Sequence, residues 1–137
     1  ITTQYAPLGV SFGSAAGSIP AFVYGAFTAD FTGKSLGNDA FQYQGPVAAT
    51  FTVAKSAVGV VVRDGDPSVG SATLTAYSGP NGTGIALGSS GSPGGAGNDP
   101  YFLGLVDTGP SPRIRSVVVR IQRVGGSDIT LDDFTFR

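Results

Sequence analysis

The feature that most constrains the fold is the spacing of turn residues, which divides the chain into about ten short runs. The runs are rich in Val, Ile, Thr, Phe and Tyr, which favour strands, and Gly, Pro, Asn, Asp and Ser separate them. They lie at about 8–13, 19–28, 40–44, 47–54, 56–63, 70–78, 83–88, 101–106, 113–124 and 128–136. Short strands at this spacing predict an all-β antiparallel sandwich or barrel.

The composition supports the same class. All nine acidic residues are Asp and none is Glu, while Gly, Thr, Ser, Val and Phe dominate. Because Glu and Lys favour helices, a helical domain is excluded. The 137 residues are enough for one hydrophobic core, and no repeat of 20–50 residues divides the chain. Residues 1–137 are therefore expected to form a single domain.

Charge excludes two classes of partner. The net charge is −1 and 12% of the residues are charged, so no basic surface for nucleic acid or anionic membrane is expected. No apolar run approaches the roughly 18 residues of a membrane span. We expect neither nucleic-acid binding nor membrane insertion.

Catalysis is not expected either, since the chain has no His and no Cys and so lacks the commonest general base and the thiolate nucleophile. Zinc and haem sites are excluded on the same ground. Paired aspartates, as in glycoside hydrolases, remain as candidate catalytic groups. Adjacent aspartates in a strand point to opposite faces, however, which argues against a shared substrate.

The core is predicted from side-chain alternation within four of the runs. Residues of one parity are apolar in each: Val47, Ala49, Phe51 and Val53; Val58, Val60 and Val62; Leu74 and Ala76; Val117, Val119 and Ile121. The segment YSGPNGTGIAL predicts a hairpin, because Asn81 and Gly82 tolerate positive φ. The segment 88–99, GSSGSPGGAGND, is predicted to be a surface loop.

The closing segment LDDFTFR changes the parity of its apolar residues. Leu131 is odd-numbered, whereas Phe134 and Phe136 are even-numbered, so a regular strand would turn them to opposite faces. Either a β-bulge at Asp132-Asp133 redirects a carboxylate, or the strand changes the face that it buries.

The aspartates suggest calcium, which takes oxygen ligands at irregular spacing. We expect Asp132 and, less directly, Asp133 as ligands at a bulge, although a solvated edge or an arginine-paired carboxylate explains them equally well. Asp64 and Asp66, in DGD, resemble part of a calcium loop, but turn formation is the favoured interpretation. Calcium is thus expected as a structural cofactor.

Sugar recognition requires aromatic faces beside hydrogen-bonding groups. Tyr43 lies beside Gln42 and near Asp39, and Tyr77 has the parity opposite to Leu74, so it should face solvent. These residues are the predicted ligand contacts. The alternative is that each Tyr forms the rim of the core with its hydroxyl in water.

The order of the segments ITTQYAPLGVSF, SAVGVVVRDGDPSVGSATLTAYSGPNGTGIALG, YFLGLVDTGPSPRIRSVVVRI and ITLDDFTF resembles a jelly-roll β-sandwich module of secreted and surface bacterial proteins, of the PEP-CTERM-associated type. This module is distantly similar to carbohydrate-binding modules. The resemblance implies a secreted or cell-surface location, a non-catalytic domain and polysaccharide as partner. It also implies that Asp132 on the closing strand ligates calcium.

Two functions follow from these observations. The first is a secreted, calcium-stabilised carbohydrate-binding module that recognises extracellular or cell-wall polysaccharide. The second is a structural or adhesive subunit of an extracellular assembly or filament, in which low charge and an open sheet edge serve packing between copies of the chain. Binding of sugar by an isolated monomer favours the first, and concentration-dependent oligomers favour the second.

Overall fold

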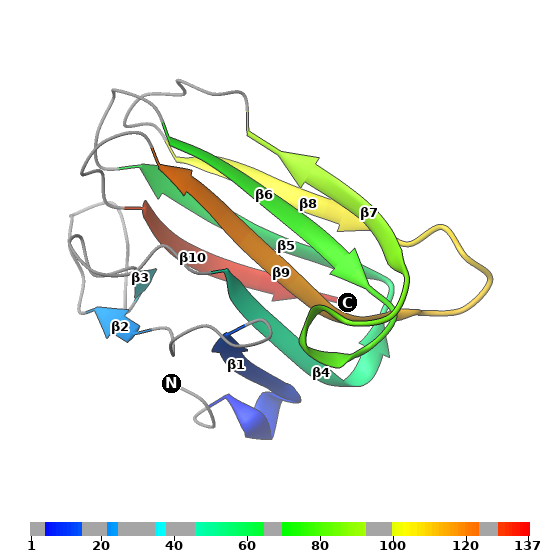
Figure 1. The fold of residues 1–137 in the computed structure, drawn as a ribbon. Coiled ribbons are helices and arrows are strands. Elements are labelled where there is room, and N and C mark those ends of the chain that lie inside the picture. The colour runs from blue at the N-terminus through cyan, green and yellow to red at the C-terminus, as the bar shows by residue number, and fades with distance from the viewer. Residues whose placement is uncertain are drawn as a thin grey trace.

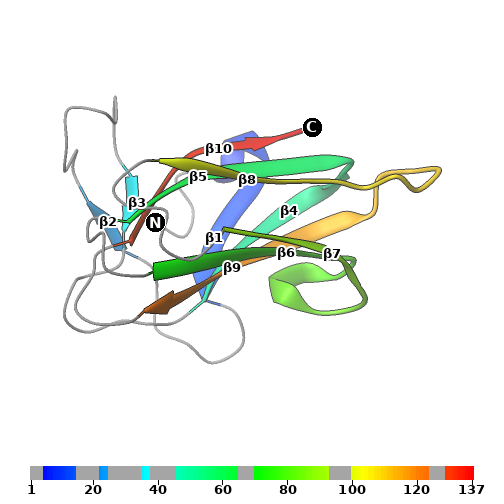
Figure 2. The same cartoon turned by 90° about the horizontal axis from the view of Figure 1, so that it is seen from above.

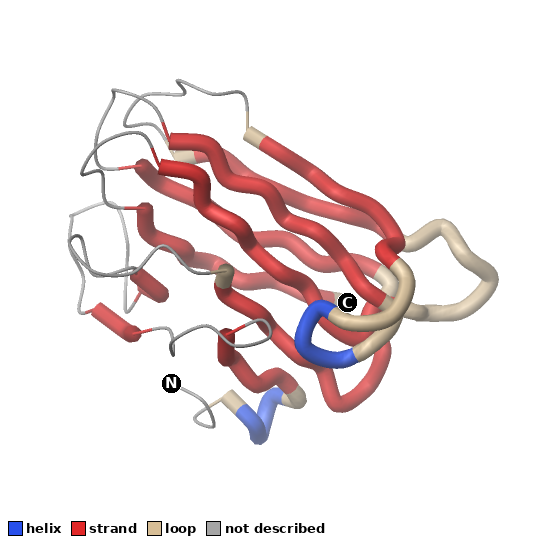
Figure 3. The backbone as a smooth tube through the Cα atoms, in the orientation of Figure 1, coloured by secondary structure: helices blue, strands red, loops and turns tan. Residues whose placement is uncertain are grey.

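The chain folds into two antiparallel β-sheets that face each other as a sandwich (Figures 1 and 2). The structure is a computed structural model that describes residues 5–14, 22–24, 35–37, 46–64, 70–92, 100–123 and 129–137. Outside the strands, the described residues form connecting turns and two 3-10 helices of three residues each, η1 at Ala6–Leu8 and η2 at Pro80–Gly82 (Figure 3). No described helix is long and apolar enough to cross a membrane. The predicted all-β sandwich is confirmed.

One sheet, here sheet A, has the strand order β1-β4-β9-β6-β7. Its strands are Val10–Ser14, Val47–Lys55, Ile114–Arg123, Gly70–Tyr77 and Ala86–Gly91, in that order. The other, sheet B, has the order β2-β3-β10-β5-β8, with strands Phe22–Tyr24, Ser35–Gly37, Ile129–Phe136, Ala57–Asp64 and Tyr101–Val106.

The connections give the sandwich its jelly-roll-like character. Successive described strands lie in different sheets except for two pairs, β2 with β3 and β6 with β7. The hairpin from β6 to β7 stays within sheet A, which confirms the prediction at Asn81-Gly82. Within sheet B, β5 pairs with β10 on one side and with β8 on the other, at the centre of the candidate site described below.

The core lies between the sheets and contains most of the predicted residues. Ala49, Phe51, Val58, Val60, Val62, Leu74, Ala76, Val117 and Val119 are all buried. Aromatic rings close one part of this core, with Phe51 and Phe136 at 5.3 Å and Phe12 and Phe134 at 5.3 Å between ring centroids. The residues that alternate as apolar in the sequence are therefore mostly the residues that point into the core.

Of the other predicted core residues, Val47 is partly buried against the core, Val53 is 66% exposed, and the side chain of Ile121 is not among those described. The pairing of β4 with β9 is regular up to Thr50 opposite Ser116, and then jumps to Lys55 opposite Ile114. Five steps on β4 thus match two on β9, so the side-chain parity of β4 no longer predicts the inward face. Ile114, at the start of β9, is buried instead.

The structure also moves two predicted boundaries. The run predicted at 83–88 is β7, which begins at Ala86 and continues to Gly91, so the first part of the predicted 88–99 loop is strand. The short strand β3 lies between the runs predicted at 19–28 and 40–44. The predicted run 40–44 and residues 93–99 lie outside the described residues.

The parity change in the closing strand is a β-bulge. Asp132 is opposite Val61 and Thr135 is opposite Gly59, so two residues of β10 face the single residue Val60. Asp133 adopts a φ of 46°, in the left-handed region. The extra residue turns Phe134 inward, so that it packs against the core from the same face as Leu131.

The bulge generates a testable prediction. Deletion of Asp133 removes the extra residue and leaves Phe134 opposite Val60, so Phe134 and Phe136 still point inward. The free energy of unfolding should therefore stay within about 1.5 kcal/mol of the parent, as measured by chemical denaturation. The matched comparison is deletion of Thr135, which turns one of the two phenylalanines outward and should cost at least about 1.5 kcal/mol, the burial of one aromatic side chain. A loss on deletion of Asp133 that is as large as the loss on deletion of Thr135 would contradict the bulge.

Candidate functional site

The outer face of sheet B is the surface that the strands β10, β5 and β8 turn away from the core. The register places Thr135, Gly59 and Gly104 side by side in one row across these strands. The neighbouring row on β5 and β8 holds Val61 and Phe102. Because Val58, Val60 and Val62 point inward, Gly59 and Val61 necessarily point outward.

Phe102 is the most prominent side chain on this face, with 62% of its surface exposed. Its ring extends over Gly59 and Gly104, so that a Cβ atom added to Gly59 would overlap the ring. A Cβ added to Gly104 would lie 2.5 Å from ring atom Cε1. The absence of side chains at these two positions is therefore what allows an aromatic ring to rest on the sheet with its opposite face toward solvent.

An open hollow of ≈530 Å³ adjoins this ring. Its lining residues are Ala57, Val58, Ser90, Phe102, Gly104, Leu105, Val106, Thr135, Phe136 and Arg137. Thr135, in β10 after the bulge, and Arg137, directly after the end of β10, are both exposed. Hydrogen bonds from the backbone N–H of Arg137 to the Ala57 carbonyl (2.9 Å) continue the sheet to this residue.

These groups define what the surface can do chemically. An aromatic face binds the apolar side of a flat ligand, while a hydroxyl and a guanidinium bind its oxygen atoms. None of the residues that line the hollow is a carboxylate. Acid–base chemistry by an aspartate pair therefore finds no support in this hollow, whereas binding does.

Tyr77, a predicted ligand contact, is half-buried and lies on the other sheet. Its cross-strand neighbour Ser116 is completely buried, because the loop between β6 and β7 folds over it. The Ser116 hydroxyl donates to the Gly79 carbonyl (2.6 Å) and accepts a bond from the N–H of Gly82 (2.9 Å).

The same loop also covers the neighbouring position on β4. The Thr50 hydroxyl donates to Oδ1 of Asn81 (2.9 Å) and accepts a bond from the N–H of Asn81 (3.0 Å). This part of the outer face of sheet A is thus occupied by the chain itself. The outer face of sheet B around Phe102 is the more accessible of the two.

Three of the predicted calcium ligands, Asp132, Asp133 and Asp64, lie on the paired strands β10 and β5. Asp132 is paired with Val61, and Asp64 is paired with Ile129, three residues away along both strands. Asp133 is exposed at the bulge. The part of the chain that the structure describes contains no group of three or more Asp, Glu, His or Cys residues that could hold a metal ion.

The remaining predicted site residues lie outside the described residues. They are Tyr43, Asp39 and Gln42 of the predicted sugar site and Asp66 of the DGD segment. Their assignment stays a prediction. Phe102, by contrast, was not singled out by sequence reasoning, because the run 101–106 was interpreted only as a strand.

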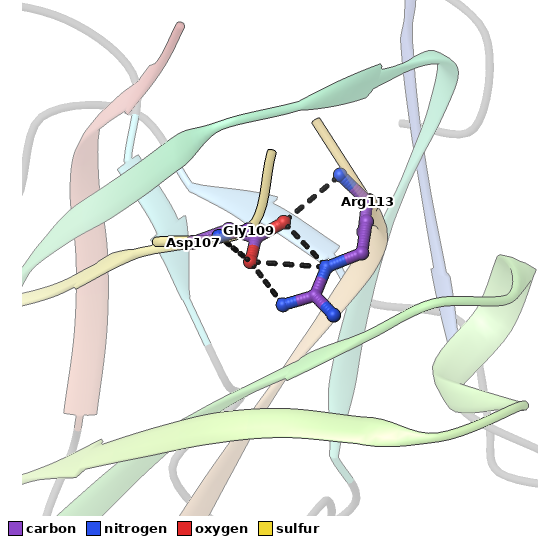
Figure 4. A network of polar contacts seen from close by, with 3 residues as sticks. All are labelled: Asp107, Gly109 and Arg113. Carbon is purple, nitrogen blue, oxygen red and sulfur yellow. Dashed lines mark hydrogen bonds and ion pairs between the residues drawn. The ribbon is translucent and has the colours of Figure 1, made fainter. Parts of the chain in front are cut away.

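One carboxylate is firmly held beside the site, in the turn that follows β8 (Figure 4). Asp107 accepts bonds from the backbone N–H groups of Gly109 (3.1 Å) and Arg113 (3.0 Å) and pairs with the Arg113 guanidinium at 2.5 Å. The Asp107 side chain is only 1% exposed. The hydrogen bond from the Arg113 side chain is the main reason why the pKa of Asp107 falls to about 2.

No protein-family model matches the chain, and no curated protein matches it. The PEP-CTERM-associated assignment therefore stays a prediction.

Solved structures do resemble the fold. The K2 cleaved adhesin domain of Lys-gingipain aligns with a TM-score of 0.64 and 13% identity over 99% of this chain and 94% of that domain. The K3 cleaved adhesin domain of the same protein from Porphyromonas gingivalis W83 has a TM-score of 0.53 and 13% identity, over 92% and 97%. The carbohydrate-binding module CBM36, in complex with calcium and xylotriose, aligns at 0.47 and 14% identity, over 93% and 99%. At such identities the two adhesin domains establish a shared β-sandwich fold, and the third alignment is too weak to add to it.

The Asp107–Arg113 pair predicts a specific response to acid. The ionised Asp107 is favoured in the folded state, so its contribution to stability is present above the ordinary pKa of 3.8 and is lost as pH falls through about 2. Asp107→Asn should therefore melt below the parent at pH 7, and the difference in Tm should shrink between about pH 4 and pH 2. Thermal melts across this range measure it. A difference that is the same at pH 7 and pH 2 would contradict the ion-pair assignment.

Proposed function

We propose that the protein is a non-catalytic carbohydrate-binding domain whose site is the outer face of sheet B around Phe102. The observation that carries this proposal is the exposed ring of Phe102 resting on Gly59 and Gly104. A ring in this position offers one whole face to a pyranose, whose own apolar face is a set of C–H groups. Thr135 and Arg137 lie beside it to bind hydroxyl or carboxylate oxygens.

The proposed ligand is an extracellular or cell-wall polysaccharide, and the proposed location of the domain is outside the cell. The open shape of the hollow suits a long chain better than a small molecule, because small-molecule sites enclose most of their ligand. The near-neutral net charge of −1 is compatible with an uncharged polymer. These assignments rest on the Phe102 surface and on the resemblance of the sequence to secreted modules.

A second contact surface remains proposed from the sequence, around Tyr43, Asp39 and Gln42 with Tyr77. Tyr77 provides the test of this surface, since it lies on sheet A and is independent of Phe102.

The sugar-binding proposal predicts the effect of one substitution. Phe102→Ala should weaken retention on the polysaccharide that binds the parent at least about tenfold, a loss of ~1.4 kcal/mol, because the stacking face is removed. Affinity electrophoresis and pull-down with cellulose, xylan, chitin and mannan measure this change.

The matched control is Ile85→Ala, which truncates another exposed apolar side chain, in the loop before β7. Its retention should equal that of the parent. Tyr77→Ala distinguishes the two surfaces, since a loss in this variant alone would assign binding to sheet A. Retention of every polysaccharide by Phe102→Ala at parent strength would contradict the Phe102 site.

Calcium is proposed as a structural ion at Asp132, with Asp133, Asp64 and Asp66 as the other candidate ligands. An ion that binds only the folded state stabilises it by about 2.7 kcal/mol when its free concentration is a hundred times Kd. This stabilisation raises the melting temperature. The Tm should thus rise with added Ca²⁺ and fall with EDTA in the parent, and Asp132→Asn should remove the response. Identical melting curves of the parent in Ca²⁺ and in EDTA would contradict the proposal that calcium is bound.

A further inference from the structure

Strand β8 ends sheet B without the features that protect sheet edges. It is the last strand in the order β2-β3-β10-β5-β8, and no described residue pairs with its other side. Its sequence, YFLGLV, contains no charged residue and no proline. Edge strands usually carry Lys, Pro or a bulge, which prevent pairing with other chains. Among the residues that the structure describes, the free edge of β8 therefore has no partner strand.

The backbone groups that a further strand would bind follow from the ladder. The N–H of Asp107 donates to the Ser56 carbonyl (2.7 Å), so Asp107 directs its polar groups toward β5. Antiparallel strands alternate in this respect from residue to residue. Phe102, Gly104 and Val106 consequently direct their N–H and C=O groups to the open side.

We propose that a second copy of this chain pairs with this edge, β8 antiparallel to β8, about a two-fold axis at Gly104. In this register Gly104 faces Gly104 of the second copy, and Phe102 faces Val106 of the second copy. The same contact occurs on each side of the axis, as a closed two-fold interface requires. It brings Phe102 and Val106 together as cross-strand neighbours on the outer face, where they are 62% and 66% exposed.

The chemistry of the edge favours a second copy over other occupants. An edge without charges repels no copy of itself, and the inward Leu103 and Leu105 of both chains would continue one apolar face. One six-residue strand from each copy buries less than the roughly 1,200 Å² of a standard stable interface. The dimer is therefore a weak one, formed at high concentration or on a shared ligand.

Pairing would also join the proposed sugar sites. The row of glycines would then cross four strands, with Gly59 and Gly104 of one copy followed by Gly104 and Gly59 of the second copy. The two Phe102 rings would then lie on one face, about two strand spacings or ~9.5 Å apart. The pairing itself rests on the strand edge and holds whether or not the rings bind sugar.

The first test is the concentration dependence of mass, by analytical ultracentrifugation and light scattering without any glycan. The parent should shift from monomer to dimer with concentration, and Val106→Lys should raise the dissociation constant at least tenfold. Val53→Lys is the matched control, because Val53 is also 66% exposed and the charge change is identical. Its dissociation constant should equal that of the parent. A parent that is monomeric at the highest soluble concentration overturns the proposal, as does equal weakening by both variants.

The second test measures the register and does not depend on the stability of one variant. The chain has no native cysteine, so Phe102→Cys and Val106→Cys can be prepared separately and mixed under oxidising conditions. Facing residues have Cα atoms about 5.5 Å apart, within the range of a disulfide. Each residue and its own copy would be ~14 Å apart, which is beyond that range. Disulfide dimers in the mixture alone support the pairing, whereas dimers of either single variant, or none in the mixture, overturn it.

Discussion

The alternation of β5 between buried valines and an outward glycine is the constraint on which the rest of the structure depends. Val58, Val60 and Val62 are buried between the sheets, and β5 is held between β10 and β8. Gly59 is thereby fixed on the outer face with no side chain. Gly104 is paired with it on β8, so two positions in one row are bare. The ring of Phe102 packs against the backbone at these two positions.

The bulge in β10 serves the core and the surface together. Because it inserts one residue, Phe134 and Phe136 continue the inward face that Leu131 begins. For the same reason Thr135 comes to lie opposite Gly59, on the outward face. In a regular strand of the same sequence, Phe134 and Phe136 would point outward and Thr135 would point inward. The positive φ of Asp133 is the local backbone cost, and aspartate is among the residues that tolerate it.

Side-chain period predicted the class of fold, the two-layer arrangement and most of the core, because those features depend on local alternation. It failed at Val53, where a long irregularity between β4 and β9 decides which face is buried. The parity change in LDDFTFR indicated either a bulge or a change of the buried face. It did not decide between them, and so did not predict that both phenylalanines point inward. Phe102 was missed because its exposure depends on glycines in two strands whose pairing the sequence does not state. The sequence does hold one signal, since Phe102 and Gly104 have the parity opposite to Leu103 and Leu105.

The proposed site places carbohydrate on the exposed face of the Phe102 ring, which rests on Gly59 and Gly104. The most direct measurement is a titration of the ¹⁵N-labelled protein with soluble β-1,4-linked xylan and glucan oligosaccharides, followed by ¹H–¹⁵N NMR. We expect saturable shifts concentrated at the amides of Gly59, Phe102, Gly104 and Thr135. Shifts concentrated instead at Thr75, Tyr77 and Ser116 on sheet A, or no shifts with any oligosaccharide that the intact protein retains as polymer, would contradict the proposed site.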